Sequence, residues 1–339
     1  MKKGNFLALK EALETKCSIV IVSHKSPDGD AMGSSLAVFH LLQKKGHNVQ
    51  VIVPNEDPSF LKWMPGREHV LVFENENLIS SEKIAAADYI FCLDFNTLGR
   101  IEKMGDLVAE SSAEKIMIDH HQEPDDFAAY MISDTSACST AQLIYRFMEM
   151  MDYSDLLDAE IASCIYTGIV TDTGSFRFDS VTAETHKIVA DLIAAGAENA
   201  TIHSNLFDNN SESRLRLLGY CLSQKMRLFP EFKTAVISLT VEEKLRFGFQ
   251  KGDTEGFVNY PLSMGDIKMS IFLIEYSHGI KMSFRSKGSF SVNRFAREHF
   301  DGGGHNNAAG GHSEANEEAI MKKLLAVLPD YKEALWEDE

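Results

Sequence analysis

Cysteine is scarce in this sequence, and its spacing matches no common metal or disulfide pattern. The 339 residues include five cysteines, and no two of them form a C-x-x-C pair. They are Cys17, Cys92, Cys138, Cys164 and Cys221. An odd number of thiols, most of them in apolar or helical segments, predicts buried free cysteines in a reducing compartment. This excludes a disulfide framework and a cysteine-based zinc site.

Positive charge is also in short supply. The chain has 33 Lys and Arg against 50 Asp and Glu, which gives a net charge of −17. A protein that binds long duplex nucleic acid normally carries a basic face, so we expect no such ligand. Metal ions or a few clustered Arg and Lys can still reverse the field locally and bind phosphate. This charge balance therefore favours small phosphorylated ligands.

The sequence lacks an uninterrupted apolar run of about 18 residues, so no membrane span or membrane partner is expected. Charged residues at Lys10, Glu11 and Glu14 break the first apolar run, which argues against a secretory leader. We therefore expect a cytoplasmic protein. Hydrophobic residues make up 44% and charged residues 24% of the chain, which predicts packed globular domains, and the length suffices for two.

The first 200 residues alternate between strand-like and helix-like patterns. β-branched or apolar runs predict strands at 17–23, 48–53, 89–94 and 115–118. Helical spacing covers 31–44 and 159–171, and Ser136 is predicted to N-cap a helix that carries Leu143 and Phe147. Strands that alternate with helices indicate an α/β fold with a doubly wound parallel sheet. Such sheets bind ligands at the carboxyl ends of their strands.

The pattern changes after about residue 198. We expect a first domain over 1–198, a polar linker over 199–225 and a smaller α+β domain over 226–339. Strands are predicted in this second domain at 234–239, 267–276 and 280–285. Ser291 is predicted to cap a helix that runs to Phe300, and the last helix is expected over 316–328.

Carboxylate and imidazole side chains follow several of the predicted elements. They are His24, Asp28, Asp30, Asp94, His120, His121 and Asp172. Gly29 permits a tight turn between Asp28 and Asp30, so the two carboxylates can face two different ions. Each residue taken alone is also typical of an ordinary turn or helix cap. Their joint occurrence predicts a shared metal site at the carboxyl edge of a sheet.

The donor chemistry limits which ions fit this predicted site. A mixed set of Asp and His without Cys suits Mn²⁺ or Mg²⁺, and less clearly Fe, Co or Zn. Asp94 ends a strand and could bridge two ions, while His120 supplies a nitrogen ligand. Two ions about 3.5–4 Å apart would clamp an in-line displacement at phosphorus and generate a bridging hydroxide.

Four segments resemble the motifs of the DHH phosphoesterase superfamily. They read H-K-S-P-D-G-D-A-M-G-S-S at 24–35, C-L-D-F-N at 92–96, I-D-H-H at 118–121 and G-I-V-T-D-T-G-S-F-R-F at 168–178. The segment G-G-G-H-N-N-A-A-G at 302–310 resembles the signature of the associated DHHA1 domain. The resemblance covers nearly the whole chain. By length and domain spacing it is strongest to the nano-RNase/pAp phosphatase branch, which degrades very short oligonucleotides and dephosphorylates 3′-phosphoadenosine 5′-phosphate (pAp).

The resemblance implies a role for each residue of the predicted site. One metal would be held by His24, Asp28 and Asp94, and the second by Asp30, Asp94, His120 and Asp172, with Asp94 bridging. His121 would not be a primary ligand. It would act with Asp94 as a catalytic residue, facing the scissile phosphate and either stabilising its charge or protonating the leaving oxygen. All seven positions are intact in this sequence.

The second domain carries candidate substrate contacts. Glycines at Gly302, Gly303 and Gly304 would let backbone N–H groups approach an anion, and His305 adds a donor. A flexible turn is the plainer interpretation of the glycines alone. Arg285 could grip a terminal phosphate with two hydrogen bonds, or could be an ordinary solvated charge at a strand end.

These observations predict a two-metal phosphoesterase. It would hydrolyse nano-RNA and linear dinucleotides such as pApA to mononucleotides, or pAp to AMP and phosphate, or both, with Mn²⁺ preferred and Mg²⁺ or Co²⁺ as alternatives. A pyrophosphatase or exopolyphosphatase and a cyclic dinucleotide phosphodiesterase are the rival activities. A nucleotide-binding regulator without turnover is the rival class. The methionine-rich segment 147–151 is expected to serve as core or as a homodimer contact.

Overall fold

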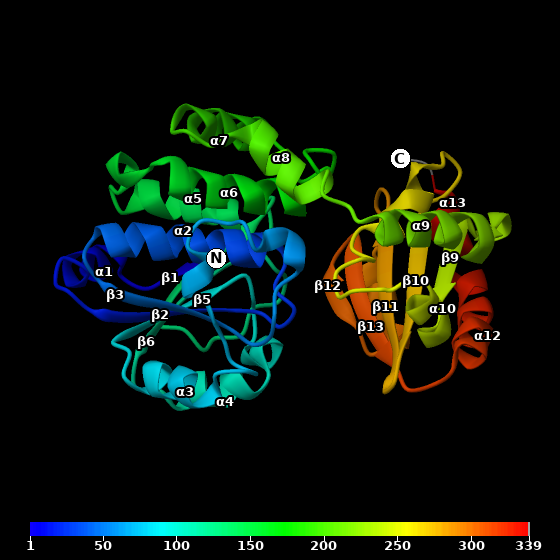
Figure 1. Ribbon diagram of the computed structural model, residues 1–339, viewed down its shortest axis with the longest axis horizontal. Helices are drawn as coiled ribbons and strands as arrows, with labels where there is room; N and C mark the ends of the chain where they lie inside the picture. Colours follow the sequence, from blue (N-terminus) through cyan, green and yellow to red (C-terminus); the bar gives the residue numbers. More distant parts are fainter. Residues whose placement is uncertain (338–339) are drawn as a thin grey trace. The chain divides into compact units, whose positions relative to one another are not determined.

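The protein is described here from a computed structural model in which residues 1–337 are placed. The chain divides into two compact units, Met1–Asn209 and a second unit from Asn210 onward (Figure 1). The boundary between the two units lies within residues 199–225, the segment that was predicted from the sequence to be a linker. Helix α8 (Asn199–Phe207) precedes this boundary, and helix α9 (Glu212–Tyr220) follows it.

The first unit is built on a seven-stranded sheet. The strands are β1 (Lys2–Lys3), β2 (Ser18–Ser23), β3 (Asn48–Val53), β4 (Leu71–Val72), β5 (Tyr89–Leu93), β6 (Glu114–Asp119) and β7 (Tyr130–Ser133). Their order is β1-β7-β6-β5-β2-β3-β4. Every neighbouring pair is parallel except β1 and β7, where an antiparallel strand is added at the edge. The predicted parallel α/β sheet is confirmed.

Helices cover both faces of this sheet (Figure 1). The helices of this unit are α1 (Phe6–Ala12), α2 (Gly29–Lys44), α3 (Asn77–Ala85), α4 (Lys103–Glu110), α5 (Thr140–Met150), α6 (Ala159–Asp172) and α7 (Ala183–Ala194), in addition to α8. Helices α7 and α8 pack on α6 and not on the sheet. Helices α2, α5 and α6 lie on one face, and α3 and α4 lie on the other. The sheet is therefore doubly wound.

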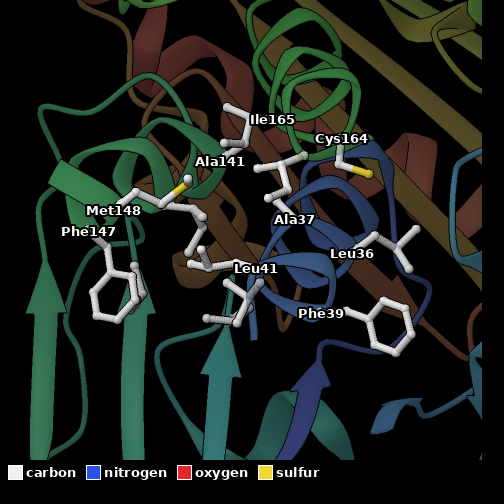
Figure 2. Packing of buried hydrophobic residues seen from close by; sticks show 14 of the residues in the cluster. Leu36, Ala37, Phe39, Leu41, Ala141, Phe147, Met148, Cys164 and Ile165 are labelled. Carbon is white, nitrogen blue, oxygen red and sulfur yellow. The ribbon is translucent and has the colours of Figure 1, made fainter. Parts of the chain in front are cut away.

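Strand β2 shows why both faces are apolar. Ile19 and Ile21 pack into the core beneath α2, α5 and α6, whereas Val20 and Val22 pack into the core on the α3 and α4 side. Successive side chains of a strand point to opposite faces, so a central strand must be apolar throughout. Figure 2 shows part of the larger core, to which Leu41 of α2 and Met148 of α5 both contribute.

Helices α2 and α6 cross closely because glycine stands at their contact. A Cβ on Gly33 would lie 2.6 Å from the carbonyl oxygen of Cys164, and a Cβ on Gly168 would lie 2.8 Å from Oδ1 of Asp30. Neither distance leaves room for a side chain. This close approach brings the start of α2, which carries Asp30, next to the end of α6, which carries Asp172.

The second unit has a mixed six-stranded sheet in the order β12-β13-β11-β10-β9-β8. Its strands are β8 (Met226–Phe229), β9 (Thr234–Leu239), β10 (Met269–Tyr276), β11 (Gly279–Ser286), β12 (Gly303–His305) and β13 (Ala308–Ser313). All neighbours are antiparallel except β9 and β10. Its helices are α9, α10 (Val241–Arg246), α11 (Val292–His299), α12 (Glu317–Val327) and α13 (Lys332–Trp336). The predicted α+β class is confirmed.

Two local predictions in the helices had different outcomes. Ser291 caps α11 through a hydrogen bond from the backbone of Arg294, as expected. The predicted N-cap at Ser136 is wrong, because Asp134 accepts hydrogen bonds from the backbone and hydroxyl of Ser136 and holds it in a turn. Ser139 caps α5 instead, and accepts a hydrogen bond from the backbone of Gln142.

The structure also describes the cysteines and the apolar character of the helices. Four cysteines are buried, Cys17 is partly buried, and all five are free thiols. Over residues 1–337, none of the helices combines the length and the apolar character that a membrane crossing needs.

Candidate metal centre

The sheet of the first unit has one position where its strand order reverses. After β2 the chain continues to β3 and β4 on one side, and it returns to place β5 on the other side of β2. Carboxyl ends of parallel strands at such a switch point form a crevice that binds ligands. His24 directly follows β2 and Asp94 directly follows β5. The predicted site therefore lies where this topology places ligands.

The first group of possible metal ligands consists of His24, Asp28 and Asp94, whose nearest donor atoms lie within 4.8 Å of one another. His24 Nε2 is 3.3 Å from Asp94 Oδ2 and 3.9 Å from Asp28 Oδ1. His24 Nδ1 donates a hydrogen bond of 2.9 Å to the carbonyl of Lys25. Because a carbonyl only accepts, Nδ1 carries a proton, and Nε2 is the ring nitrogen that faces the carboxylates and can bind a metal ion once it has lost its own proton.

The loop that carries this group is held at several points. Ser26 has φ +55°, a left-handed conformation, and its backbone N–H donates to Asn55 Oδ1 at 2.7 Å. Asp28 caps α2, because its carboxylate accepts hydrogen bonds from the backbones of Asp30 and Ala31 at 3.0 and 3.1 Å. These contacts hold the Asp28 carboxylate at the start of α2.

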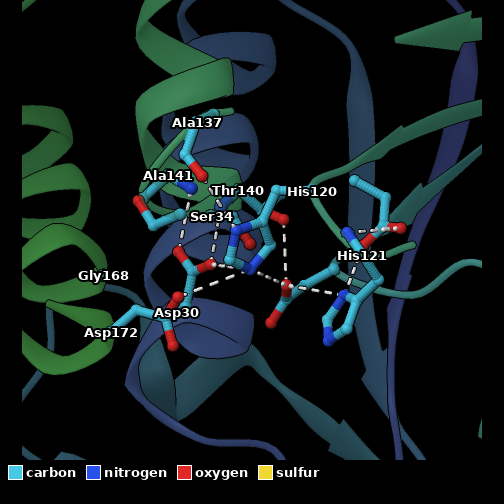
Figure 3. A network of polar contacts seen from close by, with 12 residues as sticks. Asp30, Ser34, His120, His121, Ala137, Thr140, Ala141, Gly168 and Asp172 are labelled. Atoms are coloured by element: carbon cyan, nitrogen blue, oxygen red, sulfur yellow. Dashed lines mark hydrogen bonds and ion pairs between the residues drawn. The ribbon is translucent and has the colours of Figure 1, made fainter. Parts of the chain in front are cut away.

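The second group consists of Asp30, His120 and Asp172 and satisfies the same 4.8 Å criterion. His120 Nε2 lies 3.4 Å from Asp172 Oδ2 and 3.8 Å from Asp30 Oδ2 (Figure 3). It also lies 3.7 Å from Asp94 Oδ1. Asp94 therefore contacts the histidine of each group, which is the position that a bridging carboxylate requires.

Asp94 reaches this position through an unusual backbone conformation. Its φ is +64°, in the left-handed region that Asp tolerates better than most residues. Its backbone N–H donates to the carbonyl of Ile118 at 3.1 Å, which extends the ladder between β5 and β6 by one residue. The turn ends the strand and directs the carboxylate between His24 and His120.

His121 is paired with the carboxylate that precedes it. Its Nδ1 lies 2.7 Å from Oδ1 of the fully buried Asp119, and its backbone N–H donates to the other oxygen at 3.1 Å. The same Nδ1 is 3.7 Å from Asp94 Oδ1. Asp119 therefore fixes the ring orientation and the tautomer of His121, beside the proposed bridging carboxylate.

Opposing charges shape the electrostatics of the centre. Burial alone would raise the pKa of Asp94, but its hydrogen bond with His24 and the nearby imidazoles hold that pKa well below its usual range. Burial raises the pKa of Asp30 well above its usual range, and the charges of Asp94 and Asp172 raise it further. Burial would lower the pKa of His120, yet the surrounding carboxylates raise it. Carboxylates this close to each other favour binding of a cation.

The arrangement fits divalent ions by a simple distance test. Ligands on opposite sides of an ion with bonds of about 2.1 Å lie about 4.2 Å apart. In each group, the histidine Nε2 lies 3.3–3.9 Å from the carboxylates of its own group, which is below this limit. The donors are carboxylate oxygens and imidazole nitrogens, without thiolate. The clusters are therefore able to hold metal, and the assignment of individual ligands stays a prediction.

The glycine segment of the second unit differs from the expected turn. Gly303–His305 forms strand β12, which pairs antiparallel with β13, and the turn falls at Asn306 and Asn307 instead. A Cβ on Gly302 would lie 2.1 Å from the carbonyl oxygen of Gly310. Gly304 has φ +146°, and a Cβ there would lie 2.5 Å from the carbonyl oxygen of Ala308. These two glycines are needed for close backbone packing in a hairpin.

Arg285 lies in β11, opposite Ala308 of β13. It is therefore one strand away from His305, which pairs with the same Ala308 from the other side. The structure brings these two predicted substrate residues together with the glycine strand. Their role in binding a ligand stays a prediction.

Sequence reasoning missed several residues that contact the predicted ones. Asn293 of α11 donates to the carbonyl of Gly304 at 2.6 Å and accepts from Arg297 Nε at 2.9 Å, so Arg297 lies beside the glycine strand. The i, i+4 spacing of Asn293 and Arg297 was a usable signal. In the first unit, Thr140 and Ala137 contact candidate ligands, and no local pattern marked either residue.

The fold and the site together define an α/β protein with two adjoining Asp and His clusters at a sheet switch point, followed by a mixed-sheet domain. Residues 18–169 match the DHH family, N-terminal domain, and residues 233–330 match the DHHA1 domain. The bifunctional oligoribonuclease and PAP phosphatase NrnA of Thermus thermophilus is 30% identical over 292 residues, which cover 86% of this chain and 83% of that protein. This chain belongs to the DHH family.

Two further relatives extend the likeness along the chain. The protein of the same name from Bacillus subtilis is 27% identical over 312 residues, which cover 92% of this chain and 93% of the relative. An exopolyphosphatase-related protein from Bacteroides fragilis, for which there is a crystal structure, is 44% identical in sequence, and the two structures match with a TM-score of 0.93. That match covers 98% of this chain and 97% of the other.

Proposed function

We propose that this chain hydrolyses short oligonucleotides to mononucleotides and removes phosphate from pAp, with two divalent cations in the first unit. Membership of the DHH family, together with relatives named as oligoribonuclease and phosphatase, makes the chain a hydrolase of phosphoester bonds. The observation that carries the proposal is Asp94, which stands between two clusters of possible metal ligands.

The proposed ligand sets follow the two clusters. His24, Asp28 and Asp94 would hold one ion, and Asp30, Asp94, His120 and Asp172 would hold the other. Oxygen and imidazole ligands suit Mn²⁺, with Mg²⁺ or Co²⁺ as alternatives. When bound, two such ions supply Lewis-acid charge and a nucleophilic water for in-line displacement at phosphorus.

The protein side chains then have defined tasks. Asp94 balances positive charge in the centre, and its buried position keeps its distances to both histidines short. His121 is proposed to stabilise charge on the scissile phosphate or to protonate the leaving oxygen. Its hydrogen bond to Asp119 places the ring proton on Nδ1 in the neutral form and fixes the orientation of the ring.

The second unit is proposed to bind the part of the substrate away from the reacting bond. Arg285 of β11 and His305 of β12 pair with the same residue of the intervening strand β13, and both would contact a terminal phosphate. The backbone of Gly302, Gly303 and Gly304 would approach the same ligand. The net charge of −17 offers little long-range attraction to a long polyanion, so the proposed substrates are short.

One panel of substrates tests the proposal. With Mn²⁺ present, pAp and a 5′-phosphorylated dinucleotide should be hydrolysed at least tenfold faster than cyclic di-AMP or pyrophosphate. A dinucleotide should also exceed a 20-mer single strand in kcat/KM at fixed salt. Preference for pyrophosphate would indicate a pyrophosphatase, and processive shortening of the 20-mer would indicate a long-strand exonuclease. Absence of turnover on all substrates, with normal Mn²⁺ binding, would support a binding protein.

A further inference from the structure

The start of helix α5 contacts the candidate metal centre through backbone donors. Thr140 N–H donates to Asp30 Oδ2 at 2.6 Å, and Ala141 N–H donates to Asp30 Oδ1 at 2.8 Å. Both oxygens of one buried carboxylate are therefore bound by consecutive amides from an element 110 residues away in the chain. Figure 3 shows Asp30 pointing at these two residues. Each oxygen retains a second lone pair that can face a cation.

The side chain of Thr140 reaches the other cluster. Its hydroxyl donates to Asp94 Oδ1 at 2.9 Å. Thr140 is fully buried and Asp94 is 2% exposed, so water does not compete for this hydrogen bond. One residue thus contacts both Asp30 and Asp94, the proposed bridging carboxylate.

The residues just before α5 contact a third candidate ligand. The carbonyl of Ala137 lies 3.3 Å from His120 Nδ1, which must be the donor because a carbonyl only accepts. This contact directs His120 Nε2 toward Asp30 and Asp172. Within the five-residue segment 137–141, three residues therefore contact three of the six candidate ligands.

The N-terminus of α5 can bind the Asp30 carboxylate because two of its backbone N–H groups make no hydrogen bond within the helix. Ser139 accepts the hydrogen bond of Gln142 N–H at 3.0 Å, and the amides of Thr140 and Ala141 have no partner in the first turn of a helix. Amides at the start of α5, which has 11 residues, also carry partial positive charge that favours an anion. Asp30 supplies that anion.

We infer that the segment 137–141 is a positioning device for the metal centre, with Thr140 as its central positioning residue. It holds Asp30, Asp94 and His120 in register before a cation binds. Outer contacts of this kind typically change metal affinity 10–100-fold when they are removed. The inference rests on the proposed metal-dependent function, because it assigns a role toward the same ions.

The test compares two pairs of proteins that differ mainly in the hydroxyl group. The first pair compares Thr140→Val with the wild type, because valine has a similar volume to threonine but no hydroxyl group. The second pair compares Thr140→Ala with Thr140→Ser, because serine keeps the hydroxyl group that alanine lacks. Mn²⁺ binding to the metal-free protein is measured by calorimetry, and the electronic coupling of bound Mn²⁺ by electron paramagnetic resonance. We expect Thr140→Val and Thr140→Ala to weaken Mn²⁺ binding at least tenfold and to change the resonance spectrum. Thr140→Ser should stay within about threefold of wild type.

A buried threonine elsewhere provides the control. Thr234 is fully buried in the second unit, and its hydroxyl donates to the carbonyl of Phe232 at 2.7 Å. Thr234→Val should lower the thermal unfolding midpoint without changing Mn²⁺ affinity. If Thr140→Val does not fold, the comparison of Mn²⁺ affinity between Thr140→Ala and Thr140→Ser still tests the inference.

Three results would overturn the inference. Mn²⁺ affinity of Thr140→Val within twofold of wild type would show that the hydroxyl does not position a ligand. An equal loss in Thr140→Ser would assign the effect to packing of the methyl group. A wild-type protein that binds no Mn²⁺ would overturn the proposed function as well, which distinguishes that failure from the first two.

Discussion

The two units hold their polar residues in contrasting ways. In the first unit, Asp30 and Asp94 are almost completely buried and accept hydrogen bonds from elements far away in sequence. In the second unit, Arg285 and His305 are partly exposed, and they are placed by pairing within one sheet. A reacting centre needs fixed donor atoms, whereas a surface that grips the remote part of a ligand can be more open.

The two units also differ in how far positively charged side chains balance their buried or partly buried carboxylates. Asp30 and Asp94 lie among other carboxylates, and the imidazoles around them balance that charge only in part. In the second unit, Glu243 is balanced by Lys225 at 2.7 Å. An acidic cluster left incompletely balanced by the protein is suited to metal ions, whereas a paired carboxylate is suited to stabilise a fold. The predictions below test this contrast, from the largest expected effect to the smallest.

Replacement of Asp94 should have the largest effect. Asp94→Asn should lower hydrolysis of pAp and dinucleotides by more than about 10³-fold, because a neutral amide cannot balance the charge of two cations. Circular dichroism should show an intact fold, and metal analysis should show less than the wild-type content. Activity within tenfold of wild type, with metal content unchanged, would remove Asp94 from the bridging role.

His121 should affect the rate more than metal binding. His121→Ala should lower kcat by roughly 10²–10³-fold, the usual cost of losing a donor aimed at developing charge. Bound Mn²⁺ should remain at the wild-type level, measured on the same preparation. Loss of one ion per chain would instead make His121 a ligand and would overturn the proposed division of roles.

Residues of the second unit should mainly affect substrate affinity. Arg285→Ala and His305→Ala should each raise KM for pAp and dinucleotides about tenfold, because both residues are proposed to contact parts of the substrate remote from the reacting bond. A small chromogenic phosphodiester should be hydrolysed at the wild-type rate. Lys281→Ala, on the same strand, is the matched control and should change neither substrate. Equal losses on both substrates would place Arg285 and His305 near the reacting atoms.

Glu243 should affect only stability. Partial burial works against its charged form, but hydrogen bonds from Lys225 and Tyr220 outweigh burial and lower the pKa of Glu243 to about 2. A lowered pKa means that the carboxylate stabilises the fold above its ordinary pKa of 4.5 and loses this effect as pH falls toward 2. Glu243→Gln should therefore lower the free energy of unfolding by about 1 kcal/mol at pH 7, after allowance for solvent screening.

Urea unfolding at pH 7 and at pH 3 measures this difference. The gap between Glu243→Gln and wild type should shrink at pH 3, because part of the wild-type stabilisation is lost there. Glutamine can still accept the capping hydrogen bond from the Thr240 backbone, so the start of α10 stays capped. If the difference in free energy of unfolding does not change with pH, the effect arises from packing and not from the charge of Glu243.

Much of this protein was predictable from local sequence. The alternating strands and helices predicted the parallel sheet, because a buried central strand such as Ser18–Ser23 has to be apolar on both faces. The strand ends then placed His24 and Asp94 at one edge, since carboxyl ends of parallel strands coincide. Residue type and spacing along the chain were sufficient for these steps.

Only the tertiary structure identified what orients those side chains. Thr140 and Ala141 contact Asp30 across more than 100 residues, so no local pattern links them. Gly302 and Gly304 looked like parts of a turn, but their spacing is set by the opposite strand at Ala308 and Gly310. Hydrogen bonds between distant segments depend on how helices and strands pack, and packing is a property of the folded chain and not of any short stretch of it.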